Sequence, residues 1–127
     1  MQVLFTGLYN KYNGDTDLKA AITGFYFSEA PQDAVMPYIV YHLVSNVADW
    51  TYTEDMENSL IQFSIFDDHS SSTTINDIYE KLKTCYDWTA LTVAGYSHIY
   101  TMREFNNLTR INDIWQENVQ YRIEVQK

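Results

Sequence analysis

Hydrophobic and polar positions follow two different periods along this chain, and the changes of period divide it into helices and strands. Apolar residues at helical spacing predict a short amphipathic helix over residues 2–12, which stops at Asn13-Gly14. A second short helix is expected over residues 15–22, with Asp15 or Thr16 as its N-cap. The clearest helical stripe comes later in the chain and consists of Ile75, Ile78, Tyr79, Leu82, Cys85 and Tyr86.

Alternation with a period of two predicts strands in the remaining segments. Pro37 cannot donate to a strand ladder, so it belongs at the start of a strand, and residues 38–46 after it are apolar on both faces. Residues 60–66 alternate, with Ile61, Phe63 and Ile65 expected to face inward. Residues 91–105 predict a long strand, and the last strand alternates through Val119, Tyr121, Ile123 and Val125.

The order of these elements indicates an α+β fold in a single domain, residues 1–127. We expect a mainly antiparallel sheet of about four strands, with one longer helix and two short N-terminal helices packed on one face. Residues 25–27 form only a brief extended piece in this interpretation. Residues 49–58 and 103–113 are expected to be long hairpin loops, because they are polar and carry aromatic or basic residues that a turn does not need.

Composition narrows the possible functions. The 127 residues carry a formal net charge of −9, and residues 20–80 contain ten acids and neither Lys nor Arg. This balance disfavours a groove that follows nucleic-acid phosphates, since such affinity rests on basic side chains; a solubilising surface is the simpler interpretation. Aromatic residues make up 16% of the chain and include eleven tyrosines, a composition typical of interfaces. A single cysteine and the lack of a signal-peptide pattern favour synthesis in a reducing cytoplasm.

No motif indicates catalysis, a metal site or a cofactor. The run Asp67-Asp68-His69-Ser70 contains the residue types of a hydrolase triad, but four neighbours on one loop cannot converge on one atom, and we interpret the run as a polar loop that caps a helix. It also lacks the ligand spacing of a zinc or calcium motif. Cys85 falls on the apolar helical stripe, where cysteine is usually a small hydrophobic residue.

Short motifs along nearly the whole chain resemble the tail-completion or tail-terminator proteins of long-tailed bacteriophages. They are Leu8-Tyr9 in the first helix, Asp17-Leu18 in the second, and Pro37-Tyr38-Ile39-Val40-Tyr41 at the start of the apolar strand. The acid-only middle of the chain departs from the family members, which are richer in Ala and Arg. The resemblance implies a structural protein without catalytic residues, found in the virion at the tail or neck and made in the bacterial host cytoplasm.

The same resemblance implies the partners. Six copies would form a ring at the head-proximal end of the tail tube, stop tube growth and join the tail to the head-tail connector proteins, while DNA passes through without specific binding. Three alternatives stay open: another neck protein such as a head-tail adaptor, a monomeric ligand-binding module rich in Tyr and Trp, and a small hydrolase that uses His69.

Two sets of residues are candidates for contacts in such a ring. The interface set comes from the two expected loops and comprises Trp50, Tyr52, Arg103, Phe105 and Arg110. The second set would face the DNA channel or an adjoining ring, since carboxylates repel the duplex and keep it from sticking; it comprises Glu54, Asp55, Glu57, Asp67 and Asp68.

Overall fold

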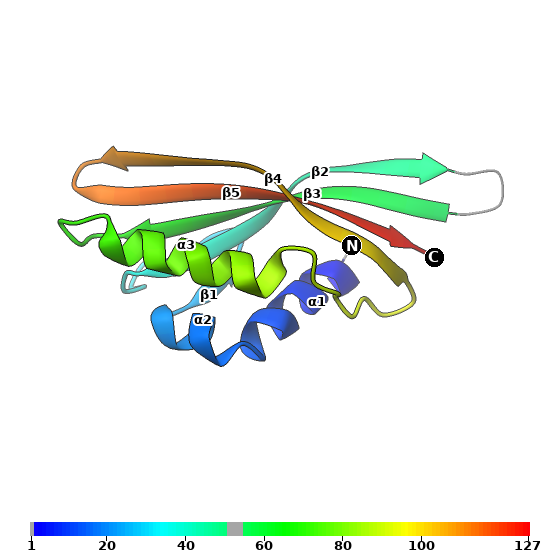
Figure 1. Ribbon diagram of the computed structural model, residues 1–127, viewed down its shortest axis with the longest axis horizontal. Coiled ribbons are helices and arrows are strands. Elements are labelled where there is room, and N and C mark those ends of the chain that lie inside the picture. The colour runs from blue at the N-terminus through cyan, green and yellow to red at the C-terminus, as the bar shows by residue number, and fades with distance from the viewer. Residues whose placement is uncertain (1, 51–54) are drawn as a thin grey trace.

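Three helices cover one face of a single five-stranded sheet, and the other face is left without helices (Figure 1). The computed structural model describes residues 2–50 and 55–127, with the backbone alone for Asp49 and Trp50. The elements, in chain order, are α1 (Gln2–Asn13), α2 (Thr16–Ala21), β1 (Phe25–Phe27), β2 (Tyr38–Trp50), β3 (Asp55–Asp67), α3 (Thr73–Tyr86), β4 (Ser97–Ile111) and β5 (Ile114–Gln126).

The sheet confirms an α+β architecture but has one strand more than the sequence predicts. Its order is β1-β2-β3-β5-β4, and every neighbouring pair is antiparallel except β1 and β2, which run parallel. The additional strand is β1, where Phe25 pairs with Ile39 and Phe27 with Tyr41. Three residues are too few for alternation to reveal a strand, so only the pairing with β2 identifies it.

The described parts of the two expected loops are largely strand, which corrects the sequence interpretation there; residues 51–54 lie outside the described residues. Residues 49–58 contain the end of β2 and the start of β3, with Trp50 paired to Asp55. Residues 103–113 continue β4 to a two-residue turn, Asn112-Asp113, whose φ angles are 53° and 62°. Positive φ at both central residues matches the type I′ turn, whose twist suits two long antiparallel strands. Polar residues can lie in these strands because the hairpin ends are solvated.

The core lies between the sheet and α3, as the two periodicities predict. Ile61, Phe63 and Ile65 of β3 are fully buried. They meet a stripe of α3 that is buried except for the partly buried Tyr79. Phe63 is central: its ring centroid lies 4.8 Å from that of Tyr86 and 5.7 Å from that of Tyr121. The inward positions of β5 are fully buried too, which confirms the predicted faces of both strands.

The N-terminal helices attach to α3 and to the segment before β4. Asp15 is the N-cap of α2, where its side chain accepts a hydrogen bond from the amide of Leu18 at 3.0 Å. The hydroxyl of Tyr86 donates to the carbonyl of Leu8 in α1 at 2.7 Å. Gly7 approaches residues 91–93 so closely that a Cβ there would lie 2.6 Å from the carbonyl oxygen of Thr92.

The segment that Gly7 contacts is not part of the sheet, so the expected strand over residues 91–105 is wrong at its start. Leu91 and Val93 are buried, but β4 begins only at Ser97. The apolar residues before Gly95 were attributed to strand alternation, and they are buried beside α1 instead.

Candidate functional site

The sheet face without helices, which we call the open face, carries a network of amide and hydroxyl side chains. Asn118 is its centre: its Oδ1 accepts hydrogen bonds from Ser64 and Gln116, both at 2.9 Å, and from Gln62 at 3.3 Å. Its Nδ2 donates to the Oδ1 of Asn107 at 3.1 Å. The network therefore joins β3, β5 and β4 through neutral groups.

This network was missed in the interpretation of the sequence, although a signal for it was present. Gln116, Asn118 and Gln120 occupy alternate positions of the last strand, opposite its inward apolar residues. Gln120 extends the network by donating to the Oε1 of Gln62 at 3.0 Å. Amides that hydrogen-bond to one another form a polar surface without net charge.

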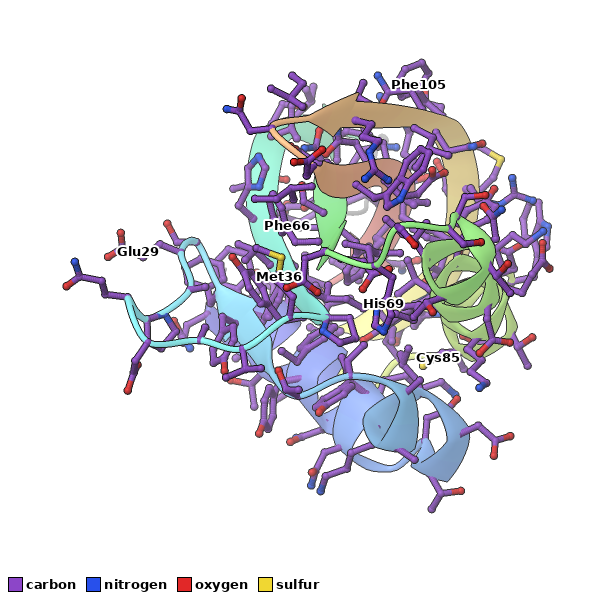
Figure 2. All side chains as sticks on the ribbon, turned by 90° about the vertical axis from the view of Figure 1, so that its left-hand side faces the viewer. Glu29, Met36, Phe66, His69, Cys85 and Phe105 are labelled. Atoms are coloured by element: carbon purple, nitrogen blue, oxygen red, sulfur yellow. The ribbon has the colours of Figure 1, made fainter. Side chains whose placement is uncertain are left out.

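A groove of about 530 Å³ lies between the open face and residues 28–32. Tyr38 and Phe66 line it, with their ring centroids 5.3 Å apart, and Gln62 and Ser64 bring in the edge of the amide network. Figure 2 shows the segment with Glu29 projecting from the body of the protein, while Phe66 lies on the sheet. The groove therefore has two walls: the sheet, with aromatic and polar side chains, and residues 28–32, which carry one acid, Glu29.

The two arginines of the predicted interface set make contacts within the chain. Arg103 donates through Nε to both carboxylate oxygens of Asp87, each at 3.3 Å, and through Nη1 to the hydroxyl of Tyr79 at 3.2 Å. Desolvation acts to lower the pKa of Arg103, but the Asp87 carboxylate and the Tyr79 hydroxyl together outweigh it, so the pKa is raised. Its side chain therefore ties β4 to the C-terminal end of α3.

Arg110 fixes the loop that precedes α3. Its Nη1 donates to the carbonyls of His69 at 3.4 Å and Ser70 at 3.0 Å, and its guanidinium lies 4.7 Å from the centroid of the Trp115 ring. Trp115 donates to the same His69 carbonyl at 3.0 Å. These contacts hold the β4–β5 hairpin against residues 69 and 70.

The aromatic members of the interface set have different positions. Phe105 lies on the open face of β4, opposite Gln120, and half of its side chain is exposed. Trp50 ends β2, but its side chain is among the undescribed parts, and Tyr52 lies outside the described residues. A role in subunit contacts stays a prediction for all three.

The five predicted channel acids do not form one group. Glu54 lies outside the described residues, Asp55 and Glu57 belong to β3, and Asp68 is exposed on the loop after it. Asp67 is fully buried, so its carboxylate cannot line a channel wall. Strand alternation places it on the same face as Ile65, toward the helices.

The buried carboxylate of Asp67 is paired with His69. Oδ1 of Asp67 lies 2.6 Å from Nδ1 of His69, and this hydrogen bond, with the negative charge behind it, raises the pKa of the imidazole. Asp67, Asp68 and His69 each offer one possible metal-ligand atom, and these three atoms all lie within 4.8 Å of one another. The three residues are consecutive, with Asp67 ending β3 and Asp68 and His69 exposed on the loop after it, so the cluster by itself identifies no metal site.

Cys85 does not have the environment of a nucleophile. Its thiol is buried between α3 and α1, where Sγ donates to the carbonyl of Lys11 at 3.9 Å. Desolvation, and next the negative charge of Asp15, raise the pKa of the thiol to about 12. A protonated buried thiol packs as a small hydrophobic group.

Among the described residues, no helix is long and apolar enough to cross a membrane. No protein-family model and no curated protein matches the chain.

Solved structures share the fold. A chain of the virion of the native gene transfer agent (GTA) particle superposes with a TM-score of 0.82 at 14% sequence identity, over 96% of this chain and 93% of that one. A second solved chain matches with a TM-score of 0.66 at 10% identity, over 99% of this chain and 95% of that one. At such identities the likeness concerns the fold alone.

Proposed function

We propose that this protein is a structural component of a phage-like virion, and specifically the tail terminator, or tail-completion protein. The observation that carries the proposal is the fold likeness, over nearly the full length of both chains, to a chain of the gene transfer agent virion. The motifs Leu8-Tyr9, Asp17-Leu18 and Pro37–Tyr41 support it independently, since they relate the sequence to the tail-terminator family.

In this role six copies form a ring at the head-proximal end of the tail tube. The ring ends tube growth and binds the head-tail connector, and DNA passes through its lumen without specific binding. Aromatic side chains at the hairpins, Trp50, Tyr52 and Phe105, contact neighbouring copies or the tube. Glu54, Asp55, Glu57 and Asp68 remain the candidates for the channel wall, because their carboxylates would repel phosphates. Asp67 is withdrawn from that set because it is buried.

Electron microscopy of the purified protein, alone and mixed with purified tail tubes, tests this function. We expect rings that bind one end of each tube and prevent the addition of further tube subunits. Rings that bind the connector but leave tube growth unaffected would indicate a head-tail adaptor. A protein that binds neither assembly would contradict a neck function altogether.

The channel-wall acids have their own test. Changing Glu54, Asp55 and Glu57 to Lys should leave tails assembled and slow DNA ejection as salt is lowered, because the new cations hold phosphates more strongly at low ionic strength. The matched control changes the exposed acids Asp17, Glu29 and Asp33 to Lys. Equal ejection by both variants at every salt concentration would place the first three acids outside the channel.

The groove beside residues 28–32 favours a second candidate function, a monomeric ligand-binding module. Its paired rings, Tyr38 and Phe66, and its amide edge are suited to a sugar or an extended peptide. An oligosaccharide or peptide that raises the melting temperature of the wild type, but not of Tyr38→Ala, would support this function. A wild-type protein that assembles on tubes and shows no such shift would reject it.

A further inference from the structure

The sheet has two free edges, one at each end of its strand order. At one end, β4 is an edge strand of 15 residues, and no strand of the described part of the chain pairs with its outer side. At the other end, β1 covers only residues 39–41 of β2, so no strand of residues 2–50 or 55–127 pairs with the outer side of residues 42–50. Unpaired main-chain amides and carbonyls on such edges are templates for pairing with another strand.

The two edges lack part of the protection that monomeric proteins place there, although β4 has two inward-pointing arginines and both β2 and β4 are bulged. Natural edges are commonly blocked by Lys, Pro or inward-pointing charge, yet residues 97–111 and 42–50 contain neither Lys nor Pro. Arg103 and Arg110 point to partners on the helix side of the sheet. The edges instead expose apolar side chains, which on β4 are Ile99, Phe105, Leu108 and Ile111, and on β2 are Val44 and Val47.

Both β4 and β2 contain bulges, but the residues between each bulge and the hairpin that follows pair regularly. The register of β4 shifts between His98 and Tyr100 and again between Arg103 and Phe105. The register of β2 shifts between Leu43 and Ser45. Residues 105–111 and 45–50 are therefore continuous ladders, each with a regular outer edge.

The two edges are complementary in strand direction and in the apolar side chains of one face. Strand order and pairing make β2 and β4 antiparallel to each other, so when the sheet of one copy continues into the next, β4 meets β2 in the antiparallel sense. Val47, Phe105 and Ile111 all lie on the open face, and a continued sheet would bring apolar side chains together there.

We propose that β4 of one copy pairs antiparallel with residues 42–50 of β2 in a second copy of this chain. Each copy would then use its two different edges for its two neighbours, which is a head-to-tail contact, and such contacts give a ring when the rotation closes. The inference rests on the proposed function for the ring itself. It adds that main-chain hydrogen bonds between sheet edges hold the neighbours together.

Two double variants test the edges separately. Phe105→Lys/Ile111→Lys alters β4, and Val44→Lys/Val47→Lys alters β2, where each replaced side chain is at least 45% exposed. Val35→Lys/Trp88→Lys is the matched control, since these residues are 66% and 70% exposed and lie outside both edges. Circular dichroism and thermal melting establish that each variant folds. We expect each edge variant to weaken self-association at least about tenfold, while the control assembles like the wild type.

Mixing the two edge variants gives the decisive result. The variant altered in β2 keeps an intact β4, and the variant altered in β4 keeps an intact β2. In a 1:1 mixture these two intact edges can pair. The two remaining edges of the resulting heterodimer are both altered, so it cannot add further copies. Native mass spectrometry should therefore show 1:1 heterodimers and no ring. Unimpaired rings from either variant alone, or a mixture that stays monomeric, would overturn the proposal, as would a wild type that is monomeric at every concentration.

Amide hydrogen exchange distinguishes main-chain pairing from side-chain packing. Assembled wild type should show slower exchange than the variants at alternate amides of residues 42–50 and 97–111, because alternate amides of an edge strand point outward. Unchanged exchange at those amides in the ring would reject edge pairing. Binding of tail tubes is measured on the same samples: a ring with protected edges that does not bind tubes contradicts the proposed function and leaves the edge contact standing.

Discussion

The covered and open faces of the sheet are made by alternate residues of the same strands, yet different forces stabilise them. On the covered face, Phe63 and its neighbours are removed from water by α3, and their contribution grows with the apolar area buried. On the open face, Gln62 and Asn118 remain close to water and contribute through hydrogen-bond geometry. The covered face therefore determines stability, and the open face is available for contacts.

The largest expected effect comes from Phe63→Ala on the covered face. Removal of a fully buried ring that packs on Tyr86 and Tyr121 should lower the free energy of unfolding by about 3–5 kcal/mol. Urea denaturation measures the change. The control is Gln62→Ala, one residue away on the open face, which should cost less than about 1.5 kcal/mol. Equal costs would remove the distinction between the faces.

Cys85→Ser tests whether water is excluded from the buried region between α3 and α1. A hydroxyl in place of the buried thiol should cost about 1–3 kcal/mol, because it is more costly to desolvate than the thiol and the Lys11 carbonyl that the thiol contacts lies 3.9 Å away. Cys85→Ala serves as the control that removes the thiol without adding a polar group. Assembly should be intact in Cys85→Ser, and loss of assembly in a folded Cys85→Ser protein would point to a chemical role for the thiol.

Asn118→Ala tests the open-face network. The substitution removes the acceptor shared by Ser64, Gln116 and Gln62, and we expect a loss of about 1 kcal/mol in the free energy of unfolding. Asn107→Ala breaks only the one bond to Asn118 and should cost less. If Asn118→Ala proved as costly as Phe63→Ala, the open face would be a structural core.

The smallest expected effect is a pH dependence of opposite sign at two histidines. The pKa of His69 is raised by Asp67, so its contribution to stability is complete below its ordinary value of 6.5 and is lost as pH rises through the folded value. Desolvation lowers the pKa of His98, so its contribution is present above 6.5 and is lost as pH falls through the folded value.

Denaturation of wild type, His69→Ala and His98→Ala between about pH 5 and 8.5 measures this difference. The stability gap between wild type and His69→Ala should shrink with rising pH, and the gap for His98→Ala should shrink with falling pH. If both stability differences changed in the same direction with pH, the environment described for one of the two histidines would be wrong. His69→Ala should also assemble normally, since its imidazole pairs with Asp67 within its own loop.

Much of the fold was predictable because periodicity reports which side of an element is buried. The stripe of α3 and the inward residues Ile61, Phe63 and Ile65 were assigned correctly, since a 3.6 or 2.0 period follows directly from backbone geometry. Asp15 as an N-cap was predictable for the same reason, because the cap bonds a residue three positions away.

The candidate site was less predictable than the fold. Arg103 and Arg110 were interpreted as interface residues because they are charged and lie in polar segments. Their partners, Asp87 and the carbonyls of residues 69 and 70, are distant in sequence, so only the folded chain reveals these contacts. Asp67 was likewise assigned to a surface by its charge, whereas strand alternation carries it inward to a pairing with His69.

By itself, the sequence determined the element types, the buried faces and the acidic, aromatic character of this protein, because these depend on local geometry and composition. Only the tertiary structure decided that residues 25–27 are a parallel edge strand, that the described parts of both expected loops continue largely as strands, and that two sheet edges have no partner strand among the described residues. Strand pairing joins residues far apart in the chain, and its hydrogen bonds are made by main-chain groups common to nearly every residue type. The side chains along β4 alone therefore do not place that strand at the end of the sheet.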